Sequence, residues 1–364
     1  MDKYFYFDDI FEDYTKYSLK ISKNLYLKSG LYPIIDQGKE EIAGYSDKNA
    51  NIFDKIPVII FGDHTRIFKY IDYPFFLGAD GVKILKNTSS LFLDKYLYYS
   101  LKNFKIPNTG YNRHFKWLKD FKIKYISLVK QEKIVSLIEK IEYFILKKKE
   151  QLKYLKKLNK SLFTKIFGDI RINNKNWETK KIDECILNNI ENINLKIKGE
   201  IAYIDISSIN NKKNKIFSCK IYNNINEAPS RAKKILNEGD ILISTVRPNL
   251  KNIAILNNKI LPLTIGSTGF CVLRFKDIIN NKYIFEIIKS DNFTEMLVKK
   301  QIGANYPAIS DRDIKLIEIP VPPIELQNKF AERVEKIEKL SFEIEKSIKE
   351  AENLYNSLIN KYFD

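Results

Sequence analysis

The chain has 364 residues, and 62 lysines and arginines against 45 acidic residues give it a formal net charge of +17. Hydrophobic residues make up 44% and aromatic residues 13%, which excludes a disordered chain and suits two or three folded domains. No apolar run is long enough to span a membrane, and three widely spaced cysteines argue against a disulfide framework, so we expect a cytoplasmic protein. The charge favours a polyanionic partner such as nucleic acid, although a lysine-rich composition would also produce it.

The first part of the chain, up to about residue 126, contains short β-favouring runs at 56–61, 73–77 and 81–85, followed by a short helical segment at 93–103. Residues 128–167 contain neither glycine nor proline, and their apolar residues recur in a heptad pattern. This pattern predicts a long helix that ends before Gly168, a residue type suited to a helix C-cap.

The second part repeats this order. β-favouring runs at 240–245 and 269–275 precede a short helical segment at 281–290. Pro322 and Pro323 then introduce a second long helix, predicted over 324–362, because proline suits the start of a helix but not its interior.

The two parts are related by an internal duplication. Residues 138–141 (IEKI) align with 334–337 (VEKI), and Gln131 aligns with Gln327, at a constant offset of 196. Shorter matches upstream pair 7–10 with 182–185, 78–81 with 266–269, and 95–98 with 282–285. The chain therefore reads as two related globular parts, each followed by a long helix.

The long helices favour pairing with each other. The offset is a multiple of seven, so both helices share one heptad register. Residues 129–169 carry a net charge of +6 and residues 323–364 carry −2. These features predict an antiparallel coiled coil; the alternative is two amphipathic helices that each pack on their own globular part.

The predicted fold class is α+β, with two globular domains of mixed, mainly antiparallel β structure separated by the two long helices. The expected domains are 1–126 and 170–322, with a central helix at 127–169 and a C-terminal helix at 323–364. Long alternating strand–helix units are absent from the sequence, which disfavours a Rossmann sheet.

Catalytic motifs are missing from the sequence. It has no glycine-rich phosphate loop, no nucleophile elbow, no paired metal-ligand motif and no (D/N)PP(Y/F) tetrapeptide of an amino-methyltransferase. The two histidines, His64 and His114, fit surface or packing roles better than catalysis. We therefore expect a protein that is not catalytic by itself and that holds no metal or cofactor.

Polar and basic loops follow the predicted strands at matched places. Arg66 and Arg247 each lie about five residues beyond a central strand, in loops with threonine, serine or asparagine. Such side chains bind base edges or phosphates of DNA; for any one arginine, a surface or phosphate-binding role is the simpler explanation. The predicted DNA-binding residues are His64, Thr65, Arg66, Lys69, Asn108, Tyr111, Asn112, Arg113, Arg231, Lys233, Ser244, Thr245, Arg247, Asn249, Lys251, Asn305 and Tyr306.

Large apolar residues also lie outside the heptad seam of the long helices. They predict a surface for partner proteins, formed by Leu137, Tyr143, Phe144, Tyr154, Leu158, Phe163 and Leu354.

The residues from Tyr306 to Gln327, which include PVPPIELQ, resemble the end of a target recognition domain in specificity (S) subunits of type I restriction–modification enzymes. Asn176 to Ile186 resembles the opening of such a domain, and Leu158 to Gly168 resembles the end of the central conserved helix. The resemblance implies a non-catalytic subunit whose two domains each read half of a split double-stranded DNA site. It also implies two methyltransferase (M) subunits and restriction (R) subunits as partners, with S-adenosylmethionine, ATP and magnesium bound on those partners.

Two alternatives stay open at this point. The chain could serve a type IIB or IIG-like system with the same architecture, or it could be a structural coiled-coil protein whose basic charge is only compositional. The DNA target and the spacer length cannot be deduced from the sequence.

Overall fold

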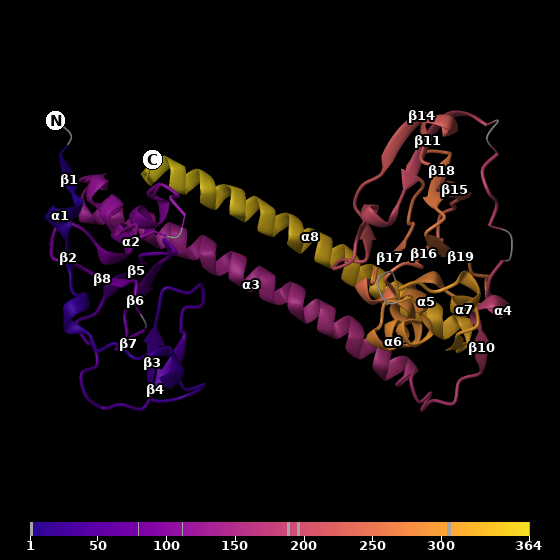
Figure 1. Ribbon diagram of the computed structural model, residues 1–364, viewed down its shortest axis with the longest axis horizontal. Helices are drawn as coiled ribbons and strands as arrows, with labels where there is room; N and C mark the ends of the chain where they lie inside the picture. Colours follow the sequence, from indigo (N-terminus) through magenta and orange to yellow (C-terminus); the bar gives the residue numbers. More distant parts are fainter. Residues whose placement is uncertain are drawn as a thin grey trace. The chain divides into compact units, whose positions relative to one another are not determined.

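A computed structural model describes residues 3–78, 80–110, 112–187, 190–194, 197–303 and 307–363. The chain forms two compact units: unit 1 comprises Met1–Glu150 and Ile344–Asp364, and unit 2 comprises Gln151–Glu343. Each unit contains one segment of each long helix, α3 (Leu128–Phe167) and α8 (Ile324–Phe363) (Figure 1). The predicted helices are confirmed almost to the residue, whereas the predicted domain limits stay a prediction.

Unit 1 contains two small sheets (Figure 1). The first is antiparallel, in the order β2 (Phe11–Asp13), β8 (Val82–Asn87), β5 (Val58–Gly62) and β6 (Phe68–Ile71). The second has the order β4 (Gly44–Ser46), β3 (Tyr32–Ile35) and β7 (Phe76–Leu77), and β3 runs parallel to β7. The strands β1 (Tyr4–Tyr6) and β9 (Lys122–Lys124) pair separately. The helices are α1 (Phe7–Ile10), α2 (Asp94–Asn103) and the 3₁₀ turns at Thr15–Tyr17, Lys23–Leu25 and Phe115–Asp120.

Unit 2 has the same plan with additions (Figure 1). One sheet has the order β17 (Ile253–Ile255), β16 (Ile241–Ser244) and β19 (Phe270–Leu273). The other has the order β14 (Lys220–Asn224), β11 (Lys198–Ile204), β18 (Thr264–Ser267) and β15 (Ala232–Ile235). Two further pairs are β10 (Thr179–Lys181) with β20 (Glu318–Pro320), and the hairpin β12 (Ile209–Asn210) with β13 (Lys215–Ile216). The helices are α4 (Ile182–Cys185), α5 (Asn281–Ile288), α6 (Asp291–Lys300), α7 (Asp311–Lys315) and 3₁₀ turns at Ile206–Ser208, Ile225–Glu227 and Pro248–Leu250.

The sheet orders show the duplication directly. β6-β5-β8 in unit 1 corresponds to β17-β16-β19 in unit 2, and β4-β3-β7 corresponds to β14-β11-β18. In both units the second sheet contains one parallel pair, β3 with β7 and β11 with β18. The predicted α+β class with mixed, mainly antiparallel sheets is thus confirmed.

In each unit the start of one long helix packs against the end of the other. In unit 1, Ile359 of α8 is buried with Ile138 of α3, and the Phe363 ring lies 5.2 Å from that of Tyr96. In unit 2, Phe167 of α3 packs 5.3 Å from Phe330 of α8. This opposed order within each unit is the one that an antiparallel pair requires, as the heptad pattern predicted.

Phe163 corrects one prediction about the helix surface. We expected it on the outer face of α3, but it is only 9% exposed and its ring stacks 5.9 Å from Tyr283. The repeat explains this burial, because the offset of 196 places Phe163 on Ile359, which is buried at the equivalent place in unit 1. Phe163 is a core residue and cannot contact a partner protein.

The matched glutamines fix the start of each long helix. The Oε1 atom of Gln131 accepts a hydrogen bond from Leu93 N at 2.9 Å, and its Nε2 donates to the carbonyls of Leu91 and Ile126. Gln327 does the same with Asn280 N and with the carbonyls of Ile278 and Pro322. Both side chains are fully buried, so each satisfies three backbone groups that water cannot reach.

We expect Gln327→Leu to lower the free energy of unfolding of unit 2 by about 1–3 kcal/mol for each backbone group left unsatisfied. Urea denaturation of the full chain measures this change, and Gln151→Leu, at an exposed position of α3, is the matched control. Equal stability of the two variants would contradict a clamping role for Gln327.

Candidate nucleic-acid interface

Two of the predicted loops in unit 1 are held together by a buried carboxylate. Oδ1 of Asp63, a residue only 4% exposed, accepts hydrogen bonds from the backbone N–H groups of His114 and Phe115, both at 2.7 Å. The buried His114 ring places its Nδ1 3.0 Å from the Asp63 carbonyl, so this histidine has the packing role that we favoured. The loop at 62–66 is therefore fixed beside the loop at 108–114.

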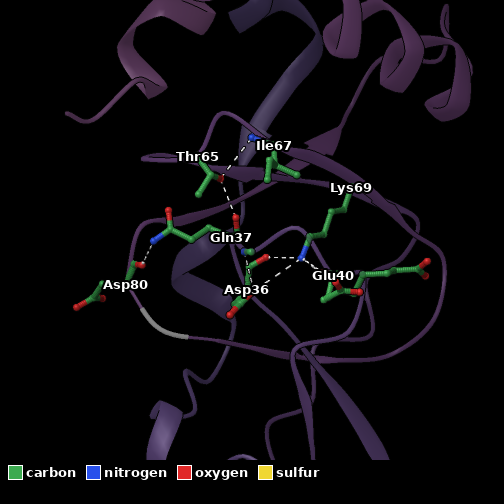
Figure 2. A network of polar contacts seen from close by, with 9 residues as sticks. Asp36, Gln37, Glu40, Thr65, Ile67, Lys69 and Asp80 are labelled. Atoms are coloured by element: carbon green, nitrogen blue, oxygen red, sulfur yellow. Dashed lines mark hydrogen bonds and ion pairs between the residues drawn. The ribbon is translucent and has the colours of Figure 1, made fainter. Parts of the chain in front are cut away.

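A third loop, residues 36–41, joins this surface, although no motif marks it in the sequence (Figure 2). Gln37 makes the hydrogen bonds that attach this loop to its neighbours. Its Oε1 accepts from His64 N at 3.2 Å, and its Nε2 donates to the Asp80 carbonyl at 3.2 Å. Thr65 Oγ1 in turn donates to the Gln37 carbonyl at 2.7 Å. Gln37 thus bonds its own loop to the loop at 62–66 and to the backbone at Asp80.

Lys69 binds the backbone of the loop at 36–41. It was predicted to contact DNA, but it is only 7% exposed. Its Nζ donates to the carbonyls of Asp36 at 2.7 Å and Glu40 at 2.6 Å, and it lies 3.8 Å from the Asp36 carboxylate (Figure 2). Burial lowers the pKa of this ammonium group, since desolvation penalises its charge. The prediction that Lys69 contacts DNA is wrong; the residue is a support for the loop.

We expect Lys69→Met to release the loop without unfolding unit 1. Methionine fills the volume but cannot bind the carbonyls, so amide hydrogen exchange of 36–41 and 62–67 should become about tenfold faster or more. Lys39→Met, at an exposed position of the same loop, is the control and should leave exchange unchanged. Unaltered exchange in Lys69→Met would remove the supporting role.

The predicted loops of unit 2 are also joined to each other, here by hydrogen bonds between backbone groups. Arg247 N donates to the Pro307 carbonyl at 2.7 Å, and Ile309 N donates to the Thr245 carbonyl at 2.8 Å. Thr245 Oγ1 donates to Gly269 O at 3.0 Å. The loop at 244–251 is therefore held against the loop that leads into α7. The predicted residues Asn305 and Tyr306, and Tyr111 in unit 1, lie outside the described residues.

The two matched arginines share an unusual backbone conformation. Arg66 has φ 60° and Arg247 has φ 49°, both in the left-handed region that non-glycine residues seldom adopt. This conformation costs about 1–2 kcal/mol per residue, and such strain is characteristic of functional sites. The two side chains differ in exposure: Arg247 is exposed, whereas Arg66 is half-buried and its Nη1 donates to the Ile106 carbonyl at 3.4 Å.

The other predicted DNA-binding residues divide by exposure. His64 and Thr245 are half-buried, and Ser244 is only 2% exposed with its Oγ bonded to the Val246 carbonyl, so Ser244 is a turn residue and not a contact residue. Lys251 is half-buried and pairs with Asp291. Seven are exposed as expected: Thr65, Asn108, Asn112, Arg113, Arg231, Lys233 and Asn249.

Apolar side chains on the long helices form a second kind of surface. Apart from Phe163, the predicted partner-binding residues are between 40% and 66% exposed: Leu137, Tyr143, Phe144, Tyr154, Leu158 and Leu354. Leu340 and Phe342, which are not among the predicted residues, are 50% and 65% exposed. That these residues bind a partner protein stays a prediction.

Within the described residues, no helix is both long enough and apolar enough to cross a membrane. The same part of the chain contains no cluster of three or more histidine, cysteine or acidic side chains arranged to hold a metal ion.

The fold and the loops define a protein with two related α+β units, each of which presents a polar loop surface that contains an arginine at a matched place. Residues 174–352 match the family described as "Type I restriction modification DNA specificity domain". The chain is 23% identical over 354 residues to a type I restriction enzyme specificity subunit of Escherichia coli, covering 91% of this chain and 85% of that one. A specificity subunit of Methanocaldococcus jannaschii is 25% identical over 304 residues, 76% of this chain and 71% of its own.

A solved structure shares the fold. The crystal structure of a type I restriction–modification system S subunit from M. genitalium covers 100% of this chain and 96% of its own, with a TM-score of 0.62 and 18% identity. Residues 174–352 therefore match a type I restriction–modification DNA specificity domain, and the chain as a whole is similar to type I restriction enzyme specificity subunits.

Proposed function

We propose that this chain reads a bipartite double-stranded DNA site, with one half-site contacted by each unit. The observation that carries the proposal is the matched pair Arg66 and Arg247, each in a left-handed conformation in the equivalent loop of its unit. An arginine held in position by the backbone loses less conformational entropy when its guanidinium pairs with guanine in the major groove.

The two half-sites should differ in sequence. The loop of unit 1 reads Gly-Asp-His-Thr-Arg over 62–66, whereas that of unit 2 reads Ser-Thr-Val-Arg-Pro-Asn-Leu-Lys over 244–251. Units with the same sheets and different loop side chains would recognise different bases from equivalent positions.

The exposed apolar residues of α3 and α8 are proposed to bind two methyltransferase (M) subunits, with restriction (R) subunits joining the complex. At the offset of 196, Phe144 and Leu158 fall on Leu340 and Leu354, so the two helices share part of an apolar surface for two copies of one partner. S-adenosylmethionine, ATP and magnesium would bind on those partners, which would carry the adenine methylation and the DNA cleavage.

Methylation sequencing tests the proposal. The chain would be co-expressed with its M subunit in a host that lacks adenine methylation, and the host genome would be sequenced for methylated adenine. The proposal predicts one bipartite, asymmetric motif that disappears when the chain is omitted. No motif, or a motif independent of the chain, would overturn it.

A further inference from the structure

We infer that the hairpin β12–β13 of unit 2 is a phosphate-binding element for double-stranded DNA. The inference deepens the proposed function, on which it rests. The hairpin turn, residues 211–214, contains none of the residues that the sequence pointed to.

Hydrogen bonds place the hairpin beside the loop that carries Arg247. Asn211 Nδ2 donates to the Leu250 carbonyl at 3.0 Å, and Asn214 Nδ2 donates to the Lys251 carbonyl at 3.2 Å. Asn214 itself has φ 50°, a conformation that asparagine tolerates better than most residues. The turn is therefore fixed to the end of the 244–251 loop, and whatever DNA reaches Arg247 lies close to it.

The charge of the hairpin suits the DNA backbone. Lys212, Lys213 and Lys215 are exposed, and the sequence from Ile206 to Cys219 contains no acidic residue. Lysine is a point charge without the planar fork of arginine, so it suits phosphates better than base edges. These lysines would position the DNA, and Arg247 would discriminate between sequences.

Unit 1 provides an internal comparison. The connection between β3 and β4 occupies the place that the hairpin occupies between β11 and β14, and it too is bonded to the arginine-bearing loop, through Gln37. Its charge is opposite: Asp36, Glu40 and Glu41 outnumber Lys39. We therefore expect phosphate contacts from this connection in unit 2 and not in unit 1.

The salt dependence of binding tests the inference. Each phosphate contact adds about 0.9 to the slope of log K against log salt concentration. Lys212→Gln/Lys215→Gln, in the complex with M subunits, should reduce the slope on a duplex carrying the methylated motif by about 1.8. Between 50 and 200 mM KCl, wild-type affinity should then fall about twelvefold more than that of the variant. The methylation motif should stay the same.

The matched control is Lys39→Gln/Lys48→Gln, which removes the same charge from exposed positions in unit 1. It should leave the slope unchanged. An unchanged slope in the hairpin variant, or an equal reduction in both variants, would overturn the inference. A wild-type complex without any sequence preference would contradict the proposed function instead. The two outcomes are distinguishable because sequence preference is read from the methylation motif, whereas the phosphate contacts are read from the salt slopes.

Discussion

Arg274→Met is expected to lower the free energy of unfolding of unit 2 by about 3–5 kcal/mol, because it leaves a buried carboxylate without its counter-charge. Asp240 is fully buried at the entrance to β16. Arg274 binds it through two parallel hydrogen bonds, from Nε to Oδ1 and from Nη2 to Oδ2, both 2.8 Å. The carboxylate also accepts from Asn237 N at 2.8 Å. The hydrogen bonds to Asp240 raise the pKa of the Arg274 guanidinium and keep it charged.

The two tryptophans allow this effect to be assigned to one unit. Trp117 lies in unit 1 and Trp177 in unit 2, where its Nε1 donates to the Phe167 carbonyl at 2.9 Å. In a Trp117→Phe background, urea unfolding followed by Trp177 fluorescence reports unit 2 alone. In a Trp177→Phe background the same substitution should leave the unit 1 transition unchanged.

A double-mutant cycle separates the pair from its surroundings. Asp240→Leu alone should also destabilise unit 2, because it leaves the guanidinium of Arg274 without a counter-charge, and this side chain is only 19% exposed. Asp240→Leu/Arg274→Met should lose less stability than the two single changes together, because no uncompensated charge remains. Strict additivity would mean that the pair contributes nothing as a pair.

The long helices could be predicted well because their signal is local and repetitive. Heptad spacing, Pro322-Pro323 and Gly168 specify the period and the ends of α3 and α8, and Gly168 does adopt φ 80°. The matched glutamines were visible as an alignment, although their identical bonds to the backbone were not. Phe163 was misplaced because a heptad pattern describes one seam, whereas its burial depends on Tyr283 of another element.

The loop surfaces were harder to predict because their partners are distant in sequence. Arg66 and Arg247 could be chosen by position, yet their shared backbone conformation depends on the turns around them. The burial of Lys69 cannot be predicted locally, because the carbonyls that bind it come from residues 36–41, about thirty positions earlier. Asn211 and Asn214 carry no motif, since an amide that binds a distant carbonyl leaves no periodic trace in the sequence.

Arg247→Ala is expected to cost about 1–3 kcal/mol of discrimination at one position of one half-site, as the loss of a bidentate arginine–guanine pair would. Arg247 is exposed, its N–H is bonded to Pro307, and the buried Pro248 follows it, so the backbone that carries the guanidinium is fixed. Methylation sequencing of the variant in the complex with M subunits should show a relaxed base in that half-site only.

Two further substitutions separate the side chain from the backbone. Arg247→Gly should relax specificity to the same extent as Arg247→Ala but leave unit 2 more stable, by about 1 kcal/mol, because glycine adopts φ 49° without strain. Arg247→Lys keeps the charge and loses the planar fork, so it should relax specificity while largely retaining affinity. An unchanged motif with evenly weaker methylation in all three variants would identify a phosphate contact and exclude Arg247 from base recognition.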